Sequence, residues 1–181
     1  MKRLLLPLLL AIPALAMAGP LKTDAANSSV TAVFRQMNVP VEGVFKRFTA
    51  RVDYDPAKPQ AARADVQIDT TTLDVGDEEM NKEVGKKEWF HTAQYPRASF
   101  VSTAIRATSP GKLTVDGKLT IKGRTANVRF PLTVRQTGTR FLFEGQLPIR
   151  RTAFLVGEGD WLDTSMVADE VIIKFRITAA Q

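Results

Sequence analysis

The sequence predicts an all-β protein, an eight-stranded antiparallel barrel with a short helix near one mouth. The main evidence is alternation: over much of residues 113–177 every second residue is apolar and the residues between are mostly polar. A period of two is typical of strands with one dry face and one wet face. Such strands must close on themselves or pair with a second sheet to bury their apolar sides. About eight segments of this kind fit the chain, and eight strands leave room for packed side chains or one slim ligand.

The expected strands follow one another along the chain, separated by turn residues. An early turn is expected from Asp55-Pro56 through Pro59-Gln60, because proline and aspartate both favour turns. Pro110-Gly111 marks a second turn, and Gly117 is expected to form a third within the alternating region. The expected strands are 30–37, 44–54, 64–68, 100–104, 113–121 (interrupted at Gly117), 128–134, 141–149 and 169–178.

Residues 77–88 interrupt the strand pattern and are expected to form a short helix. Asp77 is the expected N-cap, and acidic residues come early and lysines late, as the helix dipole prefers. Oppositely charged pairs at i,i+4 spacing are expected between Glu78 and Lys82 and between Glu83 and Lys87. This helix is either a lid over a barrel mouth or an ordinary surface helix that closes one barrel end.

Residues 1–18 are expected to be a signal peptide. Two basic residues precede an apolar run over 4–15, and Ala16-Met17-Ala18 has the small-x-small pattern of a cleavage site. The run is too short for a transmembrane helix. Cleavage after Ala18 would leave residues 19–181 as one soluble barrel domain in the periplasm. The chain has no cysteine, which excludes disulfides and acylation of a cysteine.

The formal net charge is +6, and two of these charges belong to the expected signal peptide. The remaining excess is scattered singly along strands, where alternation places it on the outer face. Scattered cations favour solubility, and weak contact with an anionic membrane surface is the second interpretation. Nucleic acid is not an expected partner of an exported protein without a basic, aromatic-studded patch. The outward cations are expected to be Arg51, Lys118, Lys122, Arg129, Arg135 and Arg176.

The search for catalytic residues favours a protein that is not an enzyme. His91 is the single histidine, so a metal site built from several histidines or cysteines is excluded. No nucleophile elbow is present. The acidic run 158–163 lacks the alternating oxygen ligands of a calcium loop. We therefore expect no catalytic residue, no metal and no cofactor.

A family signal lies in residues 43–48, 89–90 with 95–100, 115–123, and 151–157 with 167–171. In this order along the mature chain, these stretches resemble the YceI-like family. The resemblance implies a lipocalin-like antiparallel barrel that is exported to the periplasm and binds polyisoprenoid or similar long amphiphiles in its lumen. Many members have a histidine near the first strand, where this chain has Gln36-Met37-Asn38. This departure makes a histidine contact to a headgroup doubtful.

The expected ligand is the tail of a long isoprenoid lipid or isoprenoid quinone, held by a carrier that is a monomer or a homodimer. A strand of about eight residues spans about 27 Å, which suits a long chain. The alternative is a non-catalytic structural or stress-related interaction protein whose barrel core is packed. Met80, Val84, Trp89 and Phe90 are expected to gate one mouth, where a headgroup would sit. The remaining expected ligand-binding residues are Phe34, Phe48, Val52, Val66, Phe100, Val115, Ile121, Phe130, Leu132, Phe143, Phe154 and Ile173.

Overall fold

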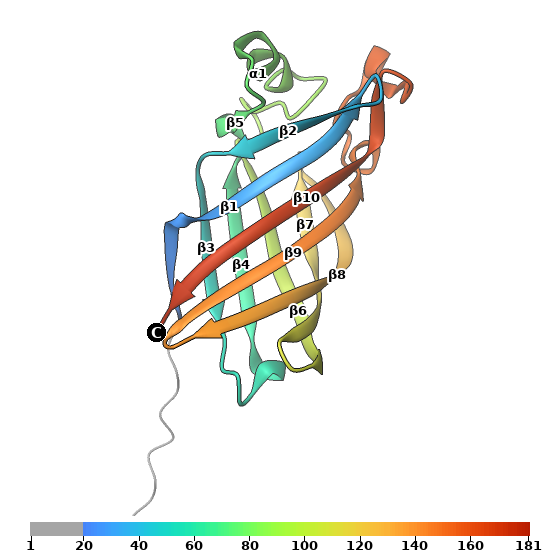
Figure 1. Ribbon diagram of the computed structural model, residues 1–181. Helices are drawn as coiled ribbons and strands as arrows, with labels where there is room; N and C mark the ends of the chain where they lie inside the picture. Colours follow the sequence, from blue (N-terminus) through green and yellow to red (C-terminus); the bar gives the residue numbers. More distant parts are fainter. Residues whose placement is uncertain (1–19) are drawn as a thin grey trace, which may run out of the picture.

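The computed structural model describes residues 20–181, so the expected signal peptide lies outside the described residues. Ten antiparallel strands form one curled sheet in the order β3-β4-β6-β7-β8-β9-β10-β1-β2-β5 (Figure 1). The predicted all-β class is confirmed. The strands are β1 (Lys22–Gln36), β2 (Val39–Phe45), β3 (Phe48–Asp53), β4 (Arg63–Asp69), β5 (Leu73–Asp74), β6 (Arg97–Ser109), β7 (Lys112–Ile121), β8 (Arg124–Thr137), β9 (Arg140–Arg150) and β10 (Val167–Ala180).

The sheet curls far enough for its edge strand β3 to contact the beginning of β1. The amide of Leu21, just before β1, donates a hydrogen bond to the carbonyl of Val52 in β3 at 2.8 Å. The hydroxyl of Thr23 donates to the carbonyl of Ala50 at 2.5 Å. These contacts close the barrel at the end away from α1 (Glu78–Val84), while the short β5 pairs with β2 at the other end.

The expected number of eight strands is wrong, mainly because residues 44–54 are two strands and not one. The chain turns a corner at Lys46 and Arg47. The amide of Lys46 donates to the carbonyl of Thr72 at 3.2 Å, and the amide of Arg47 donates to the Thr72 hydroxyl at 3.0 Å. These donors are satisfied by a turn and not by a neighbouring strand, so the ladder is interrupted there. Leu73–Asp74 adds a further short strand.

Gly117 was expected to form a turn, but it lies inside β7, and that prediction is wrong. Its neighbours along the strand, Val115 and Leu119, both face the interior and are buried. A Cβ atom added to Gly117 would lie 2.3 Å from Cε2 of Phe100. The glycine is therefore an inward position that lies against an aromatic ring, which is the other common reason for a glycine within a strand.

The expected helix forms as α1, and its N-cap is confirmed. The side chain of Asp77 accepts a hydrogen bond from the amide of Met80 at 2.9 Å. The expected i,i+4 ion pairs are replaced by i,i+3 pairs. Lys82 Nζ lies 2.7 Å from Glu79, and Lys86 Nζ lies 2.5 Å from Glu83. Residues three apart are also neighbours on a helix surface, so a helix of seven residues accommodates either spacing.

Of the six cations expected on the outer face, five are exposed and Lys122 is not. Alternation predicted an outward side chain for Lys122, but this residue has a φ of 47° in the β7–β8 turn. The left-handed backbone ends the alternation, and the side chain becomes buried. Elsewhere on the outer face, cross-strand ion pairs form, such as Arg135 with Glu144 at 2.9 Å.

Candidate ligand-binding lumen

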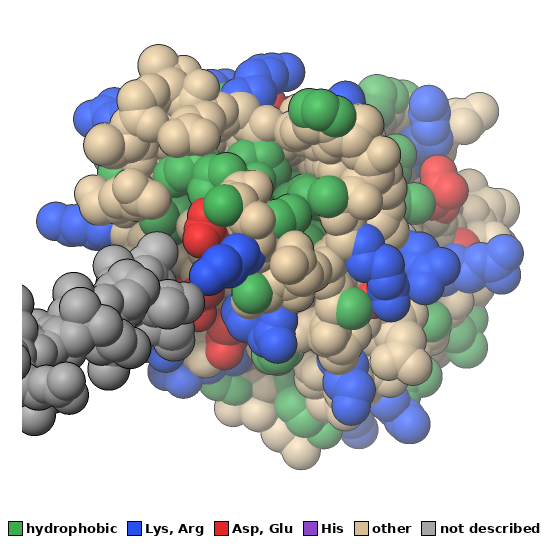
Figure 2. Space-filling view, turned by 90° about the horizontal axis from the view of Figure 1, so that it is seen from below, with side chains coloured by type: hydrophobic (Ala, Val, Ile, Leu, Met, Phe, Trp, Pro, Cys, Tyr) green, Lys and Arg blue, Asp and Glu red, His purple; other side chains and the backbone are tan. Residues whose placement is uncertain are grey.

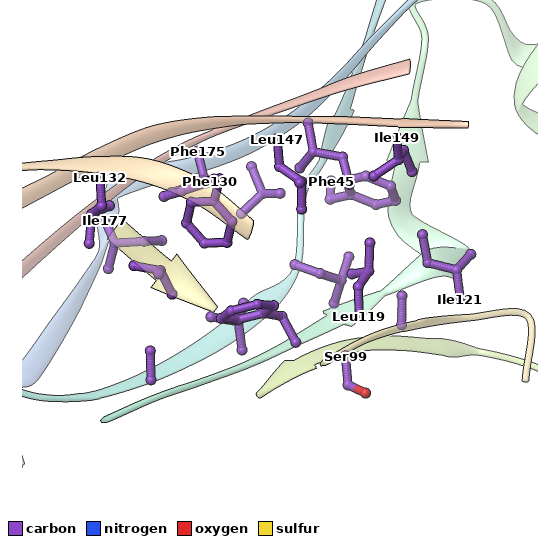
Figure 3. A pocket seen from close by; sticks show the side chains of 18 of the residues that line it. Phe45, Ser99, Leu119, Ile121, Phe130, Leu132, Leu147, Ile149, Phe175 and Ile177 are labelled. Carbon is purple, nitrogen blue, oxygen red and sulfur yellow. The ribbon is translucent and has the colours of Figure 1, made fainter. Parts of the chain in front are cut away.

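The barrel encloses an elongated cavity of about 180 Å³. Figure 3 shows aliphatic and aromatic side chains from several strands pointing into it. Among residues 20–181, the lining is apolar apart from Tyr54, Arg63, Ser99 and Arg151. Because hydrocarbon groups dominate the lining, the cavity suits a hydrocarbon chain and disfavours a charged group.

Eleven of the sixteen expected ligand-binding residues line this cavity, and five do not. Phe34 and Phe48 are partly buried and pack against the core. Met80 and Val84 belong to α1, outside the wall of the barrel. A contact of any of the sixteen with a ligand stays a prediction. The eleven that line the cavity are Val52, Val66, Phe90, Phe100, Val115, Ile121, Phe130, Leu132, Phe143, Phe154 and Ile173.

At the α1 end, two of the four expected gate residues, Trp89 and Phe90, belong to a layer of aromatic and cationic side chains. Phe90 lines the cavity and meets Phe45 edge to face, with ring centroids 6.4 Å apart. Trp89 is buried and packs on Trp161 at 5.1 Å. The guanidinium of Arg151 lies 5.7 Å from the centre of the Trp89 ring. Trp89 therefore belongs to the closure of this end and does not border the lumen.

Arg151 is the polar residue that the sequence reasoning missed. Its side chain is buried, and burial lowers the pKa of the guanidinium. The alternation of β9 contained a signal for it, because position 151 continues the inward series of Leu147 and Ile149. Its guanidinium donates five hydrogen bonds of 2.7–3.1 Å to the backbone carbonyls of Val156, Gly157, Trp161, Val167 and Ala168.

Lys122 is a second buried cation at the same end. Its ammonium donates to the carbonyls of Lys87 at 2.7 Å and Leu155 at 2.6 Å, and to the carboxylate of Glu158 at 2.7 Å. The hydrogen bond from Lys122 lowers the pKa of Glu158. An ammonium has three donors and a guanidinium has five. Lys122 and Arg151 therefore use all their donors within the protein and hold this end closed.

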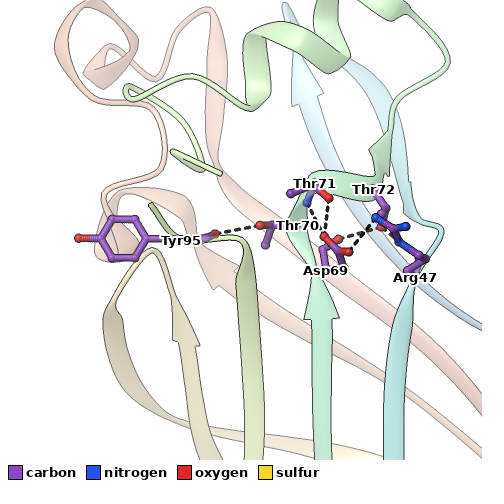
Figure 4. Close-up of polar contacts among 6 residues, drawn as sticks. All are labelled: Arg47, Asp69, Thr70, Thr71, Thr72 and Tyr95. Atoms are coloured by element: carbon purple, nitrogen blue, oxygen red, sulfur yellow. Dashed lines mark hydrogen bonds and ion pairs between the residues drawn. The ribbon is translucent and has the colours of Figure 1, made fainter. Parts of the chain in front are cut away.

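A turn beside β4 extends this closure (Figure 4). Asp69 accepts hydrogen bonds from the amide and hydroxyl of Thr71 and pairs with Arg47 at 3.0 Å, and the Thr71 hydroxyl is the main cause of its lowered pKa. The buried Thr70 donates its hydroxyl to the carbonyl of Tyr95 at 2.9 Å. The loop that follows α1 is thereby attached to the barrel wall.

The opposite end of the barrel has a different character. Figure 2, seen from that end, shows hydrophobic side chains gathered in a central recess with Lys and Arg side chains towards the edge. Arg63, which lines the cavity, is exposed there. Tyr54 packs edge to face against Phe141 and Phe143, with centroids 5.5 and 5.4 Å away, and its burial raises the pKa of its hydroxyl. At this end Arg63 therefore meets water beside the half-buried Tyr54.

Within residues 20–181, no three His, Cys, Asp or Glu side chains gather as a metal site would require. In the same range, no helix is long and apolar enough to cross a bilayer.

Fold and lumen together define a lipocalin-like barrel with an apolar interior. The chain belongs to the YceI-like domain family, whose model matches residues 21–179, and the family resemblance is confirmed. A UPF0312 protein of Pseudomonas savastanoi pv. phaseolicola is 33% identical over 108 residues, which cover 60% of this chain and 53% of that protein. A UPF0312 protein of Shewanella baltica is 30% identical over 103 residues, which cover 56% and 54%. The chain spans about half the length of these curated relatives.

Solved structures show the same architecture. The crystal structure of Burkholderia cenocepacia BcnA has a TM-score of 0.86 at 50% identity, covering 88% of this chain and 100% of that one. The Campylobacter jejuni YCEI protein has a TM-score of 0.73 at 20% identity, covering 78% and 85%. A polyisoprenoid binding domain from Saccharophagus degradans, implicated in plant cell wall breakdown, has a TM-score of 0.71 at 17% identity, covering 90% and 98%. The last two likenesses concern the fold alone.

Proposed function

We propose that this protein is a periplasmic carrier that holds the tail of a long isoprenoid lipid, an isoprenoid quinone or a similar amphiphile in its lumen. The elongated, almost wholly apolar cavity is the observation that carries the proposal. Membership of the YceI-like family and the likeness to a polyisoprenoid binding domain support it. The signal-peptide pattern of residues 1–18 supports export.

The volume of the cavity indicates how a tail would be accommodated. An apolar cavity of about 150 Å³ holds one molecule the size of benzene. The cavity of about 180 Å³ is therefore too small for a long tail unless lining side chains change rotamer. Each methylene transferred from water contributes about 0.8 kcal/mol, which offsets such rearrangement. A cavity in the centre of the barrel favours the carrier over the alternative of a structural or stress-related protein with a packed core.

We place the headgroup at the end away from α1. The two buried cations at the α1 end, Lys122 and Arg151, have all their donors occupied by protein acceptors, so a headgroup that used them would have to displace existing hydrogen bonds. At the other end, the exposed Arg63 and the half-buried Tyr54 border the cavity beside water. Because hydrocarbon burial dominates the binding energy, we expect loose discrimination among headgroups and stronger discrimination by tail length.

The test begins with native protein purified without detergent and extracted gently with organic solvent for mass spectrometry. Delipidated protein is then titrated with geranylgeraniol and with a long-chain isoprenoid quinone, each of which should raise the melting temperature. Leu119→Trp fills the lumen and should weaken binding by about tenfold or more. Lys118→Trp, at the exposed neighbouring position, is the matched control. If no amphiphile is extracted and neither compound stabilises the protein, the carrier proposal is wrong and the packed-core alternative stands.

A further inference from the structure

The two strands β7 and β9 share an unusual pattern on their inward faces. Each presents five positions to the interior, and in each the central position is glycine while the other four are apolar. Gly117 occupies the centre in β7 and Gly145 in β9. Both glycines thus lie halfway along the barrel wall, where a side chain would otherwise fill the lumen. The inward series are 113, 115, 117, 119 and 121 in β7, and 141, 143, 145, 147 and 149 in β9.

Aromatic rings from the alternate strands occupy the space that these glycines leave. The ring of Phe100 in β6 lies over Gly117, and the ring of Phe175 in β10 lies over Gly145. A Cβ atom added to either glycine would come within 2.3 Å of the respective ring. Phe130 in β8 lies between them, with centroid distances of 5.4 Å to Phe100 and 5.3 Å to Phe175.

These three phenylalanines, which we name the aromatic girdle, form an arc across five consecutive strands of the sheet, from β6 to β10. In Figure 3, Phe130 and Phe175 lie between the two ends of the pocket, on the side of Leu132. Ile177 lies toward one end of it and Ile121 toward the other. The girdle therefore separates a half of the lumen near α1 from a half at the opposite end.

The girdle rings border open space. Phe100 and Phe175 face the interior and line the cavity, yet they are only partly buried. Because the glycines offer no Cβ, these rings can lie against the wall and leave a passage beside them. Any larger residue at either glycine would force its ring toward the axis of the barrel and narrow that passage.

We propose that the aromatic girdle determines tail specificity: it admits a narrow, flexible isoprenoid chain from one half of the lumen to the other and stops a wide, rigid ring system. This inference rests on the proposed function and names the residues that select the tail. A flexible chain passes the rings with small rotamer changes. A fused-ring body would need all three rings to move at once, against the close packing of the wall.

The test uses delipidated mature protein with methyl-labelled isoleucine, leucine and valine, and three probes: geraniol, geranylgeraniol and cholestanol. Ile121 and Ile149 report the half near α1, and Ile177 reports the other half. Geranylgeraniol should shift methyl resonances in both halves. Geraniol, which is also narrow and flexible, should do the same. Cholestanol should shift resonances in one half only.

Gly145→Ala is the diagnostic variant, because the three atoms nearest to the added Cβ all belong to the flexible Phe175 ring. It should confine geranylgeraniol to one half and weaken its binding by about tenfold. Adding Phe175→Leu to this variant should restore binding and contact with both halves. Phe141→Leu, at an inward aromatic of β9 that is buried but does not border the cavity, is the matched control and should leave the distribution of shifts unchanged. Melting curves establish that each variant is folded.

The outcomes separate the two proposals. If wild-type protein binds geranylgeraniol across both halves and Gly145→Ala does the same with unchanged affinity, the girdle proposal is wrong and the carrier function stands. If cholestanol also reaches both halves of the wild-type lumen, the girdle is not selective. If wild-type protein binds none of the three probes, the carrier function fails and the girdle proposal fails with it.

Discussion

Replacing Arg151 with methionine is the most demanding test of how the α1 end is closed. Methionine retains much of the length and apolar volume that pack against Trp89, but it donates no hydrogen bond. Three of the lost hydrogen bonds are fully buried, namely those to the carbonyls of Val156, Gly157 and Val167. The remaining two are partly buried, so their acceptors can bond to water.

The magnitude follows from the three buried carbonyls. A buried acceptor left without a partner costs about 1–2 kcal/mol within the usual range. Arg151→Met should therefore lower the free energy of unfolding by about 3–6 kcal/mol. This is a large share of the roughly 5–15 kcal/mol that is typical of a domain. Arg151→Lys keeps the charge but has fewer donors in a different geometry, so it should be intermediate.

Urea unfolding followed by tryptophan fluorescence and by circular dichroism measures this effect. Trp89 and Trp161 are the two tryptophans of the chain and both lie beside Arg151, so circular dichroism guards against a local change of fluorescence. Arg150→Met removes the exposed neighbouring arginine and should change stability by less than about 0.5 kcal/mol. A loss below about 1 kcal/mol for Arg151→Met would refute the argument that these hydrogen bonds hold the end closed.

Three further predictions concern pH, the lumen and processing. The pKa of Glu158 is lowered by Lys122, so this pair stabilises the protein at a pH above the ordinary value of 4.5 and loses its effect as the pH falls through the lowered pKa. The urea midpoint of Glu158→Gln should therefore lie below that of wild type at neutral pH, and the difference should shrink in acid; a constant difference would contradict the pairing. Phe130→Asp buries an unpaired charge in the lumen and should destabilise by more than about 4 kcal/mol, whereas Thr133→Asp on the outer face should change stability by less than about 1 kcal/mol, as thermal unfolding would measure. N-terminal sequencing of the exported protein should give a first residue directly after Ala18, and an uncleaved chain would contradict the signal peptide.

Several features could be predicted from the sequence because they depend on near neighbours. The inward faces of β7 and β9 follow from alternation, since successive side chains of a strand point to opposite sides. The Asp77 cap follows from the local hydrogen bond between its carboxylate and the amide of Met80. The prediction for Lys122 failed because this alternation ends there. The Lys122 side chain leaves the alternation at a left-handed turn residue.

Gly117 illustrates why the remaining features needed the tertiary structure. In sequence, a glycine between two alternating segments is equally compatible with a turn and with a close approach inside a strand. Only the pairing of β6 with β7 brings Phe100 over it. Phe34 and Phe48 show a second limit of the sequence. An inward apolar residue can belong to the packed core and need not border the cavity, and alternation does not distinguish the two.

By itself, the sequence determined the all-β class and the apolar character of the interior, because one-sided burial imposes a period of two on each strand separately. The family followed from a different signal, the resemblance of particular stretches along the chain. Only the tertiary structure decided that Arg151 and Lys122 close one end, and that three phenylalanines on alternate strands meet over two glycines. These arrangements depend on the register between strands far apart in the chain. Register is set by the sum of many cross-strand contacts, and no single segment contains that information.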